Sequence, residues 1–232
     1  MNNNNFNYNF NNSECLGVVL AGGLSSRMGE DKALLMRNNT SMLDFSQQLL
    51  TNAGINKVVI SGNANKINDQ QQINDIVEQA GPVGGIYSVI KQYQPKALLI
   101  LPIDLPLMTS QALAKLKQIG ELSTKACFFQ DHSIPLYLPV NAFVEMFLQQ
   151  AFQGDKFKNS GRGPSIRSLL QQIPHQEVNI TNAQLLFNTN TPEQWQQAQQ
   201  TFKKQLIKAE KCKEQTVSQP ILFNKHQGAF ND

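Results

Sequence analysis

The sequence predicts an α/β fold, in which a mostly parallel central sheet lies between two layers of helices. Short apolar runs alternate along the chain with longer stretches of helical periodicity, as in parallel strands joined by crossover helices. Two apolar runs end in loops rich in glycine or proline, where a buried strand would leave its sheet. The 232 residues are 41% hydrophobic and 16% charged, which suits a globular domain with a sizeable core.

The predicted strands are short apolar segments bounded by turn-forming residues. The first is followed directly by Gly22 and Gly23, and the second is closed by Ser61, Gly62 and Asn63. The fourth is one of the longest apolar runs in the chain, as expected of a strand buried on both faces. In chain order the expected strands are 16–20, 57–60, the weaker 73–77, 97–101, 126–129, 134–138 and 177–180.

Helices are expected between these strands, where apolar residues recur at intervals of three and four. Ser110 is the expected N-cap of the third helix. Thr191 is the expected N-cap of the last helix, with Pro192 at its first position. The expected helices are 41–51, 82–93, 110–119, 140–152 and one from Pro192 that continues into the C-terminal region.

The two ends of the chain differ in composition from its middle. Residues 1–13 are a low-complexity, Asn-rich tail with too little apolar surface to pack, so this tail is expected to be disordered. Residues 14–202 carry the alternating pattern and are expected to form one folded domain. Residues 203–232 form a Lys/Gln-rich C-terminal extension.

Charge and cysteine content exclude several classes of protein. The formal net charge of +3 is too small to indicate a nucleic-acid partner. Cys15, Cys127 and Cys212 lie far apart without CxxC spacing, which argues against a disulfide framework or zinc site and suits a reducing cytoplasm. The apolar runs are far shorter than a membrane span, and the N-terminus lacks the pattern of a signal peptide. We therefore expect a cytoplasmic protein without a membrane partner.

A loop with the features of a phosphate site follows the first predicted strand. Gly22 and Gly23 let the backbone turn sharply and bring its amides close to a ligand, and successive amides form an anion-binding concavity. Ser25 adds a hydroxyl donor, while Arg27 and Lys32 add positive charge. A triphosphate requires this combination of amide donors and cations. The loop has neither the Gly-Lys-Ser/Thr ending of a P-loop nor the GxGxxG dinucleotide pattern.

A second candidate site follows the strand at 97–101. Asp104 stands there between Pro102 and Pro106. Ligands of open α/β sheets bind beyond the carboxyl ends of the strands, and Mg²⁺ prefers hard oxygen ligands that it shares with substrate phosphates. Asp104 is therefore the candidate metal ligand, with phosphate oxygens and water completing the coordination.

The glycine loop closely resembles the signature LxGGxSxRMGxDK of nucleoside-triphosphate transferases. With Arg-Met-Gly followed by Asp-Lys-Ala-Leu-Leu, it is most similar to the molybdenum cofactor guanylyltransferases of the MobA type. The resemblance covers about residues 16–200 and implies a Rossmann-like three-layer sandwich of the nucleotide-diphospho-sugar transferase type. It also implies that GMP passes from GTP to molybdopterin with release of pyrophosphate, in the presence of Mg²⁺. Apo-molybdoenzymes or their chaperones would be further partners.

The resemblance assigns roles to individual residues. The backbone of Leu20, Ala21 and Gly22 would contact the nucleotide, and Lys32 would bind its phosphates. Arg27, Lys32 and Asp104 would be the catalytic residues, with Asp104 holding the metal. The further nucleotide-binding positions would be Gly23, Ser25, Ser61, Asn63, Gln79, Gly84, Asn188 and Asn190.

Several of these positions leave alternatives open. Ser61 stands where the family often has Asn, with Asn63 close by, and Gln79 where it often has an acidic residue that would read the guanine N1 and N2 donors. Gly84 fits either a nucleotide pocket or close helix packing. Asn188 or Asn190 would bind metal-bound water or the second substrate, or would have a purely structural role.

A basic segment and two alternative functions complete the expectations. Arg162, Arg167, Lys156 and Lys158 would meet the acceptor phosphate or simply solvent. A cytidylyl- or other nucleotidyltransferase with a different phosphorylated acceptor would use the same loop. A non-catalytic adaptor that binds a nucleotide or cofactor is the alternative from another class of protein.

Overall fold

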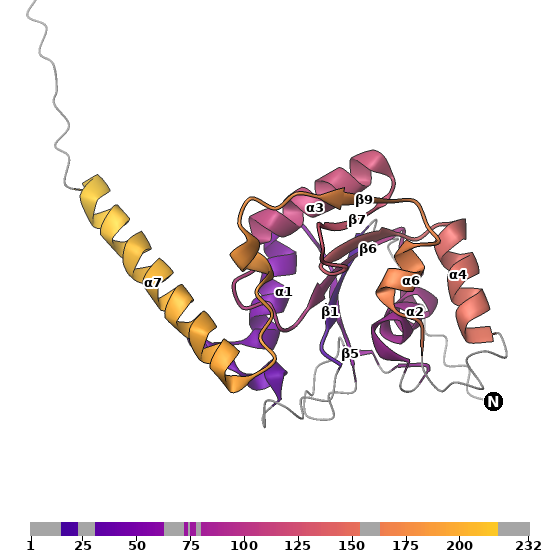
Figure 1. Ribbon diagram of the computed structural model, residues 1–232, viewed down its shortest axis with the longest axis horizontal. Helices are drawn as coiled ribbons and strands as arrows, with labels where there is room; N and C mark the ends of the chain where they lie inside the picture. The colour runs from indigo at the N-terminus through magenta and orange to yellow at the C-terminus, as the bar shows by residue number, and fades with distance from the viewer. Residues whose placement is uncertain are drawn as a thin grey trace, which may run out of the picture.

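A seven-stranded sheet forms the centre of the molecule in a computed structural model (Figure 1). The structure describes residues 15–22, 31–62, 72–73, 75–77, 80–153 and 163–217, of which 205–217 are described by their backbone alone. The strand order is β5-β4-β1-β6-β8-β7-β9, and β8 alone runs antiparallel to its neighbours. The strands are β1 Cys15–Leu20, β4 Val58–Ser61, β5 Gln72–Ile73, β6 Ala97–Pro102, β7 Ala126–Phe129, β8 Leu136–Pro139 and β9 His175–Val178. The expected α/β class with a mostly parallel sheet is confirmed.

Helices cover both faces of this sheet (Figure 1). They are α1 Met42–Asn52, α2 Gly81–Tyr93, α3 Ser110–Ser123, α4 Ala142–Gln153, α6 Ile166–Leu170 and α7 Pro192–Val217. Along β1, Val19 packs into the core beneath α1 and α3, whereas Leu16 and Val18 pack into the core beneath α2, α4 and α6. Successive strand residues point to opposite faces, so the continuous apolar runs of β1 and β6 fill two cores at once.

Most of the expected elements appear within one or two residues, and their ends have local causes. Ser41 caps α1 by accepting a hydrogen bond from the amide of Asp44, as an N-cap serine does. The expected cap of α3 was wrong by one residue, because Thr109 accepts from the amide of Ala112 and Ser110 is already helical. Thr191 is confirmed as a cap of α7 by the hydrogen bond it accepts from the amide of Gln194.

Two strands differ from their expected positions. β5 ends at Ile73 instead of continuing to residue 77, because the amide of Ile76 donates to Ser88 of α2 and so leaves the sheet edge. β9 begins at His175 instead of residue 177, because it pairs with β7 from Ala126 onward. Only Val178 of β9 is buried, so this edge strand has little apolar signal in the sequence.

The sequence patterns did not reveal the short elements around the loop between β1 and α1. A 3-10 helix, η1 Lys32–Leu34, leads into the two-stranded hairpin of β2 Met36–Arg37 and β3 Thr40–Ser41. Another 3-10 helix, η2 Ala183–Leu186, precedes the segment that enters α7. As expected, α7 continues past residue 203, and Figure 1 shows it starting beside α1 and then extending away from the sheet. Within the described residues, no helix has the length and apolarity needed to cross a membrane.

Candidate active site

The carboxyl ends of β4, β1 and β6 lie side by side and bring the sequence-predicted loops together. The carbonyl of Leu20 accepts a hydrogen bond from the amide of Ile103 (3.2 Å), and the amide of Ala21 donates to the carbonyl of Ser61 (2.9 Å). The start of the glycine loop is therefore held between the Asp104 loop and the end of β4. This is also where the strand order reverses, the usual ligand position in open α/β sheets.

Two glycines allow this close approach of β1 and β4. Gly62 has φ +145, and a Cβ there would lie 2.8 Å from the Cα of Gly22 and 2.9 Å from the carbonyl carbon of Ala21. A side chain at position 62 would thus force the two strand ends apart. The glycine pair is required for the site's shape as well as for its backbone conformation.

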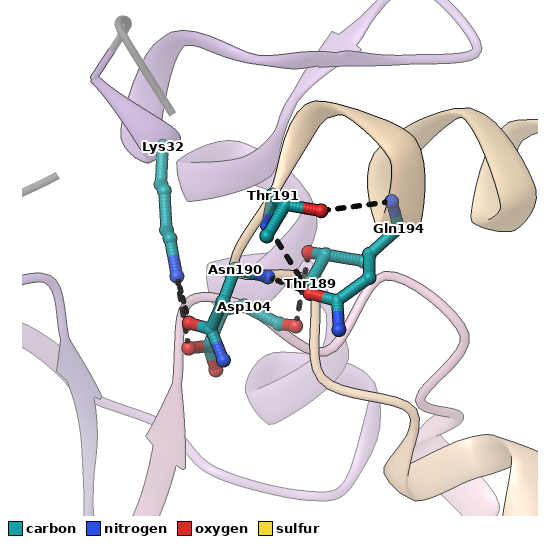
Figure 2. A network of polar contacts seen from close by, with 6 residues as sticks. All are labelled: Lys32, Asp104, Thr189, Asn190, Thr191 and Gln194. Carbon is teal, nitrogen blue, oxygen red and sulfur yellow. Dashed lines mark hydrogen bonds and ion pairs between the residues drawn. The ribbon is translucent and has the colours of Figure 1, made fainter. Parts of the chain in front are cut away.

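Lys32 is the centre of a polar cluster in which three distant segments meet (Figure 2). Its ammonium donates to Asp104 Oδ2 at 3.2 Å and to Asn190 Oδ1 at 2.7 Å. The side chains of Lys32 and Asp104 are 16% and 18% exposed, so the pair is shielded but open to a ligand. An ammonium has three donor hydrogens. Among the described residues the ammonium makes these two hydrogen bonds, which leaves its third hydrogen for an anionic ligand.

The second carboxylate oxygen of Asp104 is the best candidate cation ligand. Oδ1 is buried and has no hydrogen-bond partner among the described residues. A buried acceptor without a partner is costly, and a bound cation would remove that cost. The described residues hold no group of three or more His, Cys, Asp or Glu side chains that could bind a metal by themselves. The donor set therefore suits a hard cation shared with substrate phosphates rather than an all-protein metal cage.

The segment leading into α7 holds both Asp104 and Asn190 in place. The amide and the hydroxyl of Thr189 donate to the backbone carbonyl of Asp104, at 3.0 and 3.2 Å. The side-chain oxygen of Gln194 accepts from the amides of Asn190 (2.7 Å) and Thr191 (3.1 Å), while Thr191 accepts from the amide of Gln194 (Figure 2). This reciprocal capping box fixes the start of α7.

A carboxylate that the sequence analysis missed lies on the other side of the glycine loop. Asp75 Oδ1 is also buried without a partner among the described residues, and burial raises the pKa of Asp75. A Cβ on Gly85 of α2 would lie 3.5 Å from this oxygen and would overlap the hydroxyl of Ser61. Asp75 and Ser61 therefore meet at the first turns of α2. The available signal was the acidic residue that the family often has ahead of Gly81, which the sequence analysis aligned with Gln79, next to Glu78; both lie outside the described residues.

The other residues singled out in the sequence, and Asp31 beside Lys32, lie apart from the Lys32 cluster or outside the described residues. Gly84 packs against Ala80, and a Cβ there would overlap the Ala80 methyl, so a packing role explains this glycine. Asn188 and Arg167 are exposed and are not part of the Lys32 cluster. Asp31 caps η1 by accepting from the amide of Ala33. Outside the described residues lie the tail 1–13 and Gly23, Ser25, Arg27, Asn63, Gln79, Lys156, Lys158 and Arg162.

Comparisons with known proteins find relatives of this chain. A family model described as a MobA-like NTP transferase domain matches residues 17–178. A molybdenum cofactor guanylyltransferase of Xanthomonas euvesicatoria pv. vesicatoria (strain 85-10) is 36% identical over 182 residues, which cover 77% of this chain and 91% of that protein.

Two solved structures share the fold. Molybdopterin-guanine dinucleotide biosynthesis protein A from Archaeoglobus fulgidus matches with a TM-score of 0.64 at 18% identity, covering 82% of this chain and 99% of that one. Rv0371c from Mycobacterium tuberculosis H37Rv, solved in complex with manganese, matches with a TM-score of 0.52 at 17% identity, covering 81% and 98%.

The fold and the cluster at its carboxyl edge define a nucleotidyltransferase. Within that class, the chain belongs to the MobA-like NTP transferase family. The family model covers most of this chain, and the Xanthomonas relative is matched over nearly all of that relative's sequence.

Proposed function

We propose that this protein transfers GMP from GTP to the terminal phosphate of molybdopterin, releasing pyrophosphate and forming a guanine dinucleotide. The observation that carries the proposal is the meeting of Lys32, Asp104 and Asn190 at the carboxyl edge of the sheet. The names of the curated relative and of the structural neighbour from Archaeoglobus fulgidus supply the base and the acceptor.

The reaction needs no nucleophile from the protein. An oxygen of the acceptor phosphate forms a bond to the α-phosphorus of GTP, and the bond between that phosphorus and the bridging oxygen to the β-phosphate breaks. Pyrophosphate leaves with the bonding electron pair. Because a phosphate monoester is already anionic near neutral pH, catalysis consists of positioning and of stabilising charge on the leaving group.

Lys32 is positioned for the second of these tasks. Its ammonium is already oriented by Asp104 and Asn190, so little reorganisation is required when phosphate oxygens replace or join these partners. Arg27, in the glycine loop, is proposed as a second cation for the triphosphate. Gly23 and Ser25 are proposed to contribute donors from the same loop, as the family resemblance implies.

A divalent cation, which we propose to be Mg²⁺, fits the orphaned oxygen of Asp104. The ion would supply positive charge that draws the phosphate oxygens together. Lys32 holds Asp104 Oδ2, so the buried Oδ1 would be the oxygen that holds the cation. Asn190 contributes a side-chain amide beside the same pair and is proposed to bind a metal-bound water.

Asp75 and Ser61 are proposed to recognise the base. Guanine presents two neighbouring hydrogen-bond donors, N1–H and N2–H₂, and a carboxylate can accept from both. Asp75 has a buried oxygen without a partner beside Ser61 and Gly85, which is the free acceptor that this recognition requires. Cytosine and uracil do not present this donor pair, so Asp75 would select against CTP and UTP.

A nucleotide scan tests the proposal. Thermal unfolding would be followed with GTP, CTP, UTP and ATP, each with and without Mg²⁺, because a ligand that binds the folded state raises its Tm. A shift with GTP and Mg²⁺, followed by pyrophosphate release on addition of molybdopterin, is the expected result. A shift with CTP alone would indicate a cytidylyltransferase of the same fold. GTP binding without pyrophosphate release would indicate a non-catalytic adaptor and overturn the proposal.

A further inference from the structure

The loop that carries Asp104 is irregular and must be held by its surroundings. Between β6 and α3 the chain runs from Ile103 to Thr109 without regular secondary structure. Thr189 holds the carbonyl of Asp104 from one side. Two residues further along, the carbonyl of Pro106 accepts a hydrogen bond of 2.7 Å from Nε of Arg37. Arg37 belongs to the β2–β3 hairpin, which begins only a few residues after Lys32.

The environment of Arg37 is unusual for an arginine. Its guanidinium carbon lies 4.0 Å from the ring centroid of Phe45 in α1 and 5.1 Å from that of Phe202 in α7. In the described part of the chain no carboxylate forms an ion pair with it, and burial lowers the pKa of Arg37. An arginine nevertheless stays charged, and its planar group stacks on aromatic faces. A permanent charge is therefore kept between two rings with a backbone carbonyl as its acceptor.

This arrangement connects the Asp104 loop to α7. Leu107, from the same loop, packs with Ala198 and Phe202 of α7 in a small separate cluster. Arg37 stacks on Phe202, which belongs to that cluster, and donates to the carbonyl of Pro106, the residue that precedes Leu107. Gln194, in the first turn of α7, in turn accepts hydrogen bonds from the amides of Asn190 and Thr191, and the neighbouring Thr189 donates to the carbonyl of Asp104. A change in how α7 docks would therefore reach both Asp104 and Asn190.

We propose that Arg37 is a positioning residue, which sets the place of the Asp104 carboxylate by joining Pro106 to the docked start of α7. It acts through the loop and the helix, without contact to the reacting phosphates. The consequence is a dependence of cation affinity on a side chain outside the Lys32–Asp104–Asn190 cluster. The inference rests on the proposed cation and nucleotide site, but not on catalysis, because cation binding and helix docking can be measured without turnover.

The test compares Arg37→Met, Arg37→Lys and wild type. Methionine keeps an unbranched apolar chain but removes the charge and the donor to Pro106. Lysine keeps the charge but loses the planar group and Nε, so the conservative change should not rescue. The matched control is Lys115→Met, which removes a positive charge from an exposed position of α3.

Two readouts separate positioning from a purely structural role. The first is the affinity for Mn²⁺ in the presence of a non-hydrolysable GTP analogue, measured by electron paramagnetic resonance. We expect a roughly tenfold weaker affinity for Mn²⁺ in Arg37→Met, about the effect of disturbing one charge-assisted contact. In Arg37→Lys the affinity should be weaker by at least about threefold, which is half of that effect on a logarithmic scale. The second is acrylamide quenching of Trp195, the single tryptophan, which is buried in α7 with its ring 6.3 Å from that of Phe202. Quenching should increase in both variants and stay unchanged in Lys115→Met.

The outcomes distinguish this inference from the proposed function. Wild-type Mn²⁺ affinity and wild-type quenching in both Arg37 variants would overturn it. If Arg37→Met fails to fold, the same two measurements are made on Arg37→Lys and Phe202→Leu. Wild-type Mn²⁺ affinity and wild-type quenching in these two variants would also overturn the inference. Absence of pyrophosphate release by the wild-type protein would contradict the proposed function instead. In the active enzyme, extra Mg²⁺ should restore Arg37→Met turnover to within about threefold of wild type, since the defect is in cation binding.

Discussion

The site contains two aspartates that sit in different electrostatic surroundings. Asp104 and Asp75 each have one buried oxygen without a partner among the described residues. The other oxygen of Asp104 is paired with the ammonium of Lys32, whereas no ion pair involving Asp75 is found in the described part of the chain. Burial correspondingly raises the pKa of Asp75. We therefore propose that the Asp104 side of the glycine loop binds cations and phosphates, and that the Asp75 side binds hydrogen-bond donors.

Breaking the cationic side should have the largest effect. Lys32→Ala and Asp104→Ala are each expected to lower turnover by at least ~100-fold, the scale of losing one oriented electrostatic contact in an active site. The measurement is the initial rate of pyrophosphate release from GTP with molybdopterin. Because the two side chains are paired, the double variant should lose much less than the product of the single losses.

Two exposed positions provide matched controls for these variants. Lys115→Ala removes a lysine from the outer face of α3, and Asp131→Asn removes a carboxylate from an exposed turn. Asp131 has φ 64, a conformation that asparagine also tolerates. Both controls should retain wild-type turnover. Near-normal turnover in either Lys32→Ala or Asp104→Ala would remove that residue from the catalytic assignment.

The close approach of the ends of β1 and β4 should make the stability of the fold sensitive to a single methyl group at position 62. Gly62→Ala introduces a Cβ against the backbone of Ala21 and Gly22 at a residue with φ +145. We expect a loss of roughly 2–3 kcal/mol in the free energy of unfolding, from strain and clash together. Urea unfolding measures it.

Gly54→Ala separates strain from clash in that experiment. Gly54 has φ +85, but a Cβ there would meet nothing within 4 Å. It should therefore lose only about 1 kcal/mol, the cost of the backbone conformation alone. Equal losses at positions 54 and 62 would show that the close approach of β1 and β4 does not limit stability.

The parts of the fold that the sequence predicted well are those with local signals. The strands β1 and β6 are continuous apolar runs, and α1 has both helical spacing and a serine cap. The position of Asp104 just beyond the carboxyl end of β6 was also predicted, because a buried apolar run leads directly to it. Family resemblance then supplied the chemistry.

What could not be predicted depends on contacts between distant segments. Asn190 reaches Lys32 only because the segment before α7 crosses to the Asp104 loop, and nothing in the spacing distinguishes it from Asn188. Asp75 was missed because its position depends on the early end of β5 and on the hydrogen bond between Ile76 and Ser88. The cation–π contacts of Arg37 likewise join residues far apart in the chain.

Removing the charge of Asp75 should weaken the selectivity for GTP and raise the stability of the fold at neutral pH. Asp75→Asn offers guanine one acceptor and one opposing donor, so kcat/KM for GTP should fall by about 10–100-fold, the cost of a lost hydrogen bond to a charged group. The affinity for Mn²⁺ should not change, because Lys32 and Asp104 are untouched. Steady-state kinetics with GTP and CTP would show whether the preference between them narrows; an unchanged ratio would exclude Asp75 from base recognition.

The same variant has a predicted dependence of stability on pH. A carboxyl whose pKa is raised in the folded state binds protons more tightly there than in the unfolded chain, so the wild-type protein loses stability as pH rises through that interval. Asp75→Asn lacks this penalty. Its Tm should therefore exceed that of wild type at pH 7, and the difference should shrink as the pH approaches about 4, the ordinary pKa of an aspartate. A Tm below wild type at pH 7 would contradict this account, and Asp131→Asn should show no such trend.

The smallest expected effect is at Gln194, which acts on the cationic side alone. Gln194→Ala removes the acceptor for the amides of Asn190 and Thr191 and should cost about 1 kcal/mol of stability, as the loss of a helix cap does. Glutamate keeps an acceptor in the same place, so Gln194→Glu should restore the stability, whereas Gln197→Ala, on the exposed face of the same helix, should cost nothing. Because Asn190 is released while Asp75 and Ser61 are not, the Mg²⁺ requirement of Gln194→Ala should rise and its preference for GTP over CTP should stay constant. If the preference changed as much as the Mg²⁺ requirement, the two sides of the glycine loop would have to be treated as one coupled site.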